Sequence, residues 1–362
     1  MLNNKKRMPL FMAAFARLSN RLSGRLGGPQ PSKYNPNPAT CAADSGLAKQ
    51  GFLTPFPARE AQRAKRETVQ TFGKERRRRA FPKHGRMPLL TAAFAIALIL
   101  FIIWGNVTVG TTRYTLVSDR LPPSFDHFKI VSLSDVHNAE FGKDNSALVE
   151  LVKAEQPDMI AITGDLVDSA ETNLRVTANF LHALAQIAPC YYVAGNHEAW
   201  LGGKYPELEA LLLDASVVIL RDRAVQWERN GEVLQIAGLY DPDFTDSDPV
   251  VQQGILEEKL RRMRLTDDYC VLLSHRPEAF DAYVSAGIDL ALSGHAHGGQ
   301  FRLPLIGGLI APHQGLFPAY DAGVYEAQGT AMVVSRGIGN SVIPVRINNR
   351  PEVVSVELLC GG

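Results

Sequence analysis

Five short motifs between residues 135 and 297 carry side chains that bind divalent metal ions. The motifs are Asp135 with His137, Asp165 with Asp168, Asn196 with His197, His275 alone, and His295 with His297. A mixed set of carboxylate, amide and imidazole ligands suits Mn, Fe or Zn better than Mg or Ca, which prefer oxygen ligands. The motifs therefore predict a metal site assembled from distant parts of the chain.

Each motif directly follows a short apolar run that has the composition of a buried strand. The runs occupy residues 128–134, 159–163, 191–194, 271–274 and 290–293. A single histidine at a strand end more often bonds a backbone carbonyl than a metal. In an open α/β sheet, however, the carboxyl ends of the strands converge on one crevice, so five such motifs are expected to meet there.

The segments between these runs have helical periodicity. Apolar residues recur with helical spacing over residues 145–154, 174–185 and 208–213, and a further apolar run spans residues 217–220. Alternation of strands and helices predicts a layered α/β domain with helices covering the sheet faces. After Gly298 the helical pattern stops, and runs bounded by Gly and Pro predict antiparallel strands.

The order of the motifs, D-x-H, G-D-x-x-D, G-N-H-E, a lone His and G-H-x-H, resembles the calcineurin-like metallophosphoesterase superfamily. The resemblance covers about residues 128–359. Within the superfamily the chain resembles the bacterial membrane-associated phosphohydrolases that include diacylglucosamine pyrophosphatase-like enzymes, partly because of residues 335–339 and 349–352. The implied fold is a four-layer α/β/β/α sandwich.

The resemblance also implies a site with two divalent metal ions. One would be held by Asp135, His137, Asp165 and His297, and the other by Asp165, Asn196, His275 and His295, with Asp165 bridging the two. A metal-bridging hydroxide would then attack a phosphate ester or pyrophosphate bond. His197 would protonate the leaving oxygen as a general acid, oriented by Asp168. Two ions bring more positive charge than two aspartates remove, so the site would attract an anionic phosphate.

Three functions remain open from the sequence: hydrolysis of a lipid-linked or cell-envelope phosphate, hydrolysis of soluble small molecules or nucleotides, and a non-catalytic binding domain. Ser169 stands where related protein phosphatases carry a phosphate-binding Arg, which argues against a phosphoprotein substrate. Neither a nucleic-acid partner nor a protein partner is expected. The loop at residues 240–246 is interpreted either as a substrate rim or as a solvated acidic loop, and His313 is a candidate substrate contact.

A stretch without charge, from residue 87 to residue 104, is long enough at about 1.5 Å per residue to approach the thickness of a bilayer core. Residues 1–86 carry 19 Lys and Arg against 4 Asp and Glu, a net charge of +15, whereas the remaining 19 basic and 33 acidic residues leave −14. The positive-inside rule then predicts a single-pass anchor at 87–107 with a cytoplasmic N-terminus. The catalytic domain, residues 108–362, would be extracytoplasmic. A buried soluble helix is the alternative.

Residues 1–86 are expected to be a basic cytoplasmic segment. Residues 11–25 have the pattern of a basic amphipathic helix or, equally, of a disordered tail, and residues 27–58 are a Gly- and Pro-rich linker. The arginines at 78 and 79 also resemble a twin-arginine export signal. The four cysteines show no close spacing, which argues against a structural zinc site or a disulfide framework.

Overall fold

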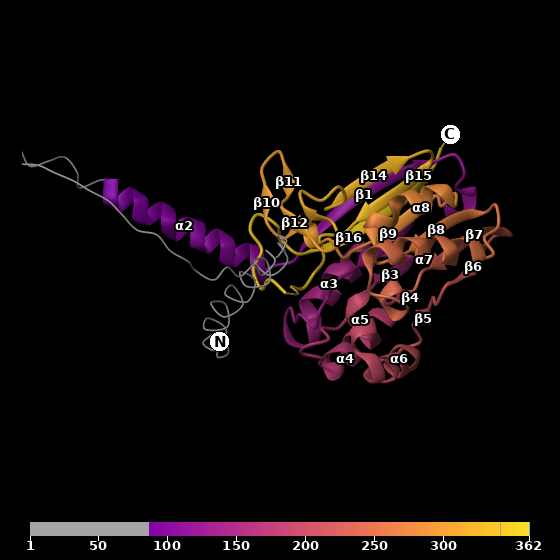
Figure 1. The fold of residues 1–362 in the computed structure, drawn as a ribbon, viewed down its shortest axis with the longest axis horizontal. Helices are drawn as coiled ribbons and strands as arrows, with labels where there is room; N and C mark the ends of the chain where they lie inside the picture. The colour runs from indigo at the N-terminus through magenta and orange to yellow at the C-terminus, as the bar shows by residue number, and fades with distance from the viewer. Residues whose placement is uncertain (1–86, 341, 362) are drawn as a thin grey trace, which may run out of the picture. The chain divides into compact units, whose positions relative to one another are not determined.

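The computed structural model describes residues 87–340 and 342–361 (Figure 1). The expectations for residues 1–86, namely the amphipathic helix, the linker and the export signal, lie outside this range. The first described element is the helix α2, Met87–Val107, which has no buried residue and is long and apolar enough to cross a membrane.

Two six-stranded sheets form the framework of the domain that follows α2. The first has the order β1-β16-β2-β3-β4-β5 and the second the order β14-β15-β9-β8-β7-β6. The strands of the first sheet are β1 Gly110–Ser118, β16 Glu352–Cys360, β2 Phe128–Leu133, β3 Met159–Thr163, β4 Cys190–Val193 and β5 Val218–Ile219. Those of the second are β14 Gly323–Ala327, β15 Thr330–Val334, β9 Leu290–Ser293, β8 Tyr269–Leu273, β7 Glu232–Gly238 and β6 Arg223–Arg229.

The two sheets pack face to face, and helices cover both outer faces. The longer helices are α3 Ser146–Glu155, α4 Leu174–Ala185, α6 Tyr205–Asp214, α7 Pro249–Arg262 and α8 Phe280–Ser285. Alternation along β2 shows the layering, because Ile130 joins the core between the sheets while Val131 joins the core under α3, α4 and α6. On β8, Val271 faces the same inner core and Leu272 faces α7 and α8. The predicted four-layer α/β/β/α sandwich is confirmed.

Helix α4 illustrates how local sequence sets these elements. The side chain of Asn173 caps its first turn by accepting a hydrogen bond from the Val176 amide. Val176, Phe180 and Leu184 then recur at helical spacing and are all buried. In the structure this helix therefore begins and ends at the predicted residues.

The expectation of purely antiparallel strands after Gly298 is wrong in part. β15 pairs antiparallel with β14 but parallel with β9, and β16 pairs antiparallel with β2 but parallel with β1. The late strands fill positions beside strands made earlier, so their direction is set by those neighbours. Between residues 302 and 316 two short hairpins are inserted, β10–β11 (Arg302–Leu303 and Gly307–Gly308) and β12–β13 (Ile310–Ala311 and Gly315–Leu316).

Candidate metal centre

The strand ends of both sheets bring the predicted residues together. The motifs follow β2, β3 and β4 in the first sheet and β8 and β9 in the second, and Asn196 and His197 open the short helix α5, Asn196–Trp200. All seven predicted ligands and His197 are buried, while Asp168 is half-buried. The central prediction from the motifs was that these side chains would meet, and in the structure they do.

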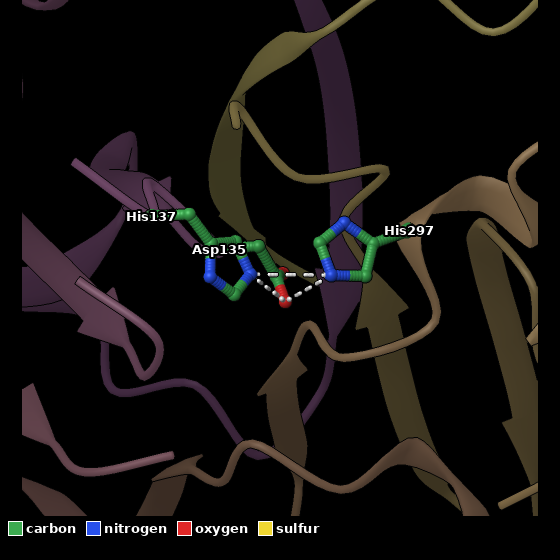
Figure 2. A group of neighbouring side chains, drawn as sticks. All are labelled: Asp135, His137 and His297. Atoms are coloured by element: carbon green, nitrogen blue, oxygen red, sulfur yellow. Dashed lines mark hydrogen bonds and ion pairs between the residues drawn. The ribbon is translucent and has the colours of Figure 1, made fainter. Parts of the chain in front are cut away.

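One group of side chains comprises Asp135, His137 and His297 (Figure 2). The Nε2 atoms of His137 and His297 are 3.3 Å apart, and Oδ1 of Asp135 lies 3.4 Å from His297 Nε2. Oδ2 of Asp165 lies 3.6 Å from His137 Nε2. Four donor atoms from three strand ends thus surround one small volume.

A second group lies on the other side of Asp165. The same Oδ2 atom of Asp165 is 3.2 Å from Nε2 of His275, and that nitrogen is 3.2 Å from Oδ1 of Asn196 and 3.1 Å from Nδ1 of His295. Asp165 Oδ2 therefore faces both groups, as a bridging ligand would.

These spacings fit metal coordination. Ligand atoms placed tetrahedrally about 2.1 Å from a metal ion lie about 3.4 Å from one another. The backbone carbonyl of Thr163 is 2.8 Å from Nδ1 of His275, so Nδ1 is a donor and Nε2 is the ring nitrogen that faces the other ligands. The residues present fit a divalent cation on each side of Asp165.

The charge states of the histidines also suit a cation site. Burial lowers the pKa of His297 to about 4 and the pKa values of His137 and His295 well below the usual range, so these rings are neutral ligands at pH 7. Burial alone would lower the pKa of His275 as well, but the carboxylates of Asp165, Asp135 and Asp241 together outweigh burial and raise the pKa to about 10. The position between Asp165 and His275 thus favours positive charge.

Five of the ligands have a left-handed backbone. The φ angles are 52° at Asp135, 46° at His137, 51° at Asp165, 65° at His295 and 48° at His297. Non-glycine residues rarely adopt this conformation, and such strain gathers at functional sites where the surrounding structure enforces it. The sharp turn after each strand points the side chain into the shared volume.

Glu198 and Gly164 hold these turns in place. The Glu198 carboxylate accepts hydrogen bonds from the amides of Asp165, Gly195 and Val167 at 2.8, 2.7 and 3.2 Å. Burial and the nearby Asp165 raise the pKa of Glu198, and the hydrogen bonds from the Gly195 and Val167 amides oppose the rise. Gly164 has a φ of 90°, and a Cβ there would lie 2.6 Å from Nδ1 of His275.

His197 lies beside the first group. Its ring contacts His137 edge to face with centroids 4.5 Å apart, and its amide donates to Asp165 Oδ1 at 2.8 Å. Oδ1 of Asp168 is 4.0 Å from Nδ1 of His197, too far for a hydrogen bond, and it accepts one from the Ala170 amide at 2.8 Å.

A buried ion pair beside the second group was not predicted. Arg276, fully buried, binds Asp241 through two hydrogen bonds of 2.7 and 2.8 Å, and its Nη1 lies 2.9 Å from His313 Nδ1 and 3.2 Å from His295 Nε2. The loop at residues 240–246 is therefore not simply solvated, since Asp241 forms part of the wall. An arginine that follows a histidine has no sequence signal for this role.

His313 and Arg346 complete the wall. Nδ1 of His313 lies 2.8 Å from Nε2 of His295, where it can accept the proton that a ligating Nδ1 leaves on Nε2. Arg346, also fully buried, places Nη2 3.4 Å from Nδ1 of His297. His313 was predicted only as a substrate contact, and Arg346 was not identified from the sequence.

Comparison with known proteins gives this arrangement its class. Residues 128–299 match the family model of the calcineurin-like phosphoesterases. The metallophosphoesterase YkuE of Bacillus subtilis, which is named as uncharacterized, is 30% identical over 258 residues, which cover 69% of this chain and 85% of that protein. The chain belongs to the calcineurin-like phosphoesterase family, and it is a phosphoester hydrolase.

Of two further relatives, one is named for an activity and the other as a transmembrane protein. The phosphodiesterase YaeI of Escherichia coli is 29% identical over 236 residues, which cover 64% of this chain and 82% of that protein. A transmembrane protein with metallophosphoesterase domain of Bos taurus is 32% identical over 251 residues, which cover 66% of this chain and 54% of that protein. The narrower resemblance to diacylglucosamine pyrophosphatase-like enzymes stays a prediction.

Proposed function

We propose that the chain is a membrane-anchored phosphoester hydrolase that uses two metal ions on a lipid-linked or cell-envelope substrate. The observation that carries this proposal is the position of Asp165 Oδ2, which lies 3.6 Å from His137 Nε2 and 3.2 Å from His275 Nε2. A carboxylate shared by two groups of candidate ligands supports a dinuclear centre rather than two separate sites.

The family resemblance implies how the ligands divide. Asp135, His137, Asp165 and His297 would hold one ion, and Asp165, Asn196, His275 and His295 would hold the other. Two divalent ions, of Mn, Fe or Zn, would supply positive charge for the phosphate and an activated water as the nucleophile. The protein contributes a rigid frame, because all seven side chains are buried and five of them lie in constrained turns.

His197 delivers the proton to the leaving oxygen. It is buried beside the first ion's ligands and is held by its amide bond to Asp165. Asp168, whose carboxylate lies 4.0 Å from Nδ1 of His197, would orient the ring after a small side-chain movement. General acid catalysis matters most when the leaving group is a poor one.

Anchoring and orientation are part of the proposal. α2 is uncharged over 21 residues and exposes its apolar side chains, which supports a single membrane span at residues 87–107. The basic residues before it support a cytoplasmic N-terminal segment, residues 1–86, and an extracytoplasmic hydrolase domain, residues 108–362. β1 begins three residues after α2 ends, so the hydrolase domain stays close to the bilayer.

A second candidate function is hydrolysis of a soluble phosphodiester, which the activity named for YaeI favours. A hydrolysis screen separates the two. The full-length chain, reconstituted in lipid nanodiscs with added Mn²⁺, is given a lipid pyrophosphate, a soluble phosphodiester and a soluble phosphomonoester, with Asp165→Asn as the inactive control. Preference for the lipid by tenfold or more in kcat/KM, an expected difference of about 1.4 kcal/mol, supports the first function. Equal or faster turnover of the soluble diester supports the second.

A further inference from the structure

A group of apolar side chains stands exposed beside the metal centre. Outside α2, seven large apolar side chains in the described part of the chain are at least 60% exposed, and five of these lie between residues 305 and 342. We call these five the apolar rim: Leu305, Ile306, Leu316, Phe317 and Val342. Such a concentration of exposed apolar residues marks an interaction surface rather than ordinary surface composition.

The rim is carried by loop tips, where polar residues are usual. Leu305 and Ile306 form the turn between β10 and β11, and Leu316 and Phe317 follow the tip of the β12–β13 hairpin. The two hairpins lie side by side, because the Leu309 amide bonds the Phe301 carbonyl at 2.8 Å and the Phe317 amide bonds the Leu309 carbonyl at 2.9 Å. Figure 1 shows β10, β11 and β12 together at one end of the sheets.

A segment beside the rim, residues 346–350, is bonded to the end of α2. Asn106, in the last turn of α2, donates to the Arg346 carbonyl at 2.8 Å and accepts from the Arg346 amide at 2.7 Å. Arg350 bonds Thr108 and the Val109 carbonyl at 2.9 and 2.6 Å, and its guanidinium lies 4.7 Å from the ring centroid of Trp104. These contacts place residues 346–350 where α2 leaves its apolar stretch.

The same segment forms one wall of the metal centre. Asn349 donates to the His297 carbonyl at 2.7 Å, and a bridge between Phe301 and Ile347 joins the two strands of this wall. Arg346 reaches His297 with its side chain while its backbone holds Asn106. One continuous structure therefore links α2, the rim and a predicted metal ligand.

We propose that the apolar rim inserts into the outer layer of the same bilayer that α2 crosses, and so positions the metal centre at the depth of lipid headgroup phosphates. The inference rests on the proposed membrane anchor. A bilayer is the occupant because residues 346–350 bond the end of the membrane-spanning helix, and Ile347 pairs with Phe301, directly before the first rim hairpin. Exposed apolar side chains held this close to the end of a membrane span are placed to enter the interface of the same bilayer. The substrate class that follows is a phosphate ester in a lipid headgroup.

Site-directed fluorescence quenching tests the position of the rim. In the full-length chain, Cys41 and Cys360 are replaced by Ser, whereas Cys190 and Cys270 are kept because they are buried. Bimane is then attached at Ile306→Cys, Phe317→Cys or Leu213→Cys. Leu213 is a matched control, since it is 64% exposed on α6 but lies outside the rim. The proteins are placed in phosphatidylethanolamine and phosphatidylglycerol vesicles that contain a doxyl-labelled lipid.

Quenching at residues 306 and 317 should exceed that at residue 213 by several-fold. Quenching equal to the control at both rim positions overturns the inference. The same result is expected if a second copy of the chain or another protein covers the rim in place of lipid. Activity on the soluble phosphodiester is measured in the same samples. Lost quenching with activity intact rejects the rim alone, whereas normal quenching without any hydrolysis rejects the proposed function and leaves the rim in place.

A pair of charged variants tests the consequence for the substrate. Ile306→Asp with Phe317→Asp should lower kcat/KM for a lipid phosphate in vesicles by about tenfold or more, because two apolar side chains leave the bilayer. Leu213→Asp should have no such effect. Both variants should hydrolyse the soluble phosphodiester at the parent rate, which shows that they fold. Equal turnover of the lipid by the rim variant and the Leu213→Asp control contradicts the inference.

Discussion

The amide of Ser169 donates a hydrogen bond to Nδ1 of His197 at 3.2 Å. A nitrogen that accepts this bond carries no proton, so in this geometry the ring proton of His197 is on Nε2. To act as a general acid the ring must also be protonated at Nδ1. The ring would then have to turn so that this N–H leaves the Ser169 amide and points toward Asp168, whose carboxylate lies 4.0 Å away. The proposed role of Asp168 is therefore tested through its effect on His197.

His197→Ala should keep both metal ions and slow hydrolysis of an alkyl phosphate ester by about 10² to 10⁴. An aryl ester with a good leaving group should be affected far less, since it departs without a proton. Asp168→Asn should show the same dependence on the leaving group with a smaller loss. Equal slowing of both esters by His197→Ala would remove the general-acid role.

Metal analysis should find two ions per chain after loading the purified full-length protein. His295→Ala removes a ligand of one group and His137→Ala a ligand of the other, so each variant should lose at least one ion and the activity on both types of ester. Asp165→Asn weakens both positions, because its Oδ2 faces both groups. Mass spectrometry of the metal content provides the count. A saturated parent protein with a single ion would contradict the dinuclear centre.

Gly164→Ala should lower metal affinity and activity much more than Gly231→Ala. Both glycines have a positive φ, of 90° and 78°, so both substitutions strain the backbone by a similar amount, about 1 kcal/mol. Only at Gly164 does the added Cβ collide, with Nδ1 of His275 at 2.6 Å, whereas nothing lies within 4 Å at Gly231. Displacement of one ligand typically costs about 10- to 100-fold in affinity, which a competition titration with a fluorescent chelator measures. Similar affinities in the two variants would show that this turn does not position the ligand.

Arg276→Met should destabilise the hydrolase domain by about 3–5 kcal/mol, because it leaves the Asp241 carboxylate buried without its partner. Arg262→Met is the control, since its ion pair with Glu258 is exposed on α7 and contributes less than about 1 kcal/mol. Thermal unfolding of both variants in the same detergent compares them. A drop no larger than that of the control would mean that water or another group replaces the guanidinium.

The proposed topology predicts which cysteines a membrane-impermeant maleimide reaches in intact cells. Val117→Cys, at an exposed position on β1, should be labelled from outside. Cys41 in the basic N-terminal segment is an internal control and should react only after the membrane is made permeable. The reverse pattern would place the hydrolase domain in the cytoplasm.

The clustering of the candidate ligands could be predicted from the sequence better than the residues around them, and the reason is physical. Ligands such as Asp135 and His295 follow strands with strong apolar patterns, and parallel strand ends must converge. Strand β1, by contrast, has a mixed pattern, because residues such as Arg113 point outward from a sheet edge. From the sequence alone, Arg276 cannot be told from an ordinary surface cation. Its burial depends on Asp241, which lies on a loop 35 residues earlier.

Strand β16 lies between β1 and β2, although it is made more than 200 residues after both. It supplies Val354, Val356 and Leu358 to the core between the sheets. Until Glu352–Cys360 has been synthesised, β1 has no partner in its sheet and β2 has only β3. The domain therefore cannot complete its fold while its chain is still growing, which leaves the first sheet open during any passage across a membrane as an extended polypeptide.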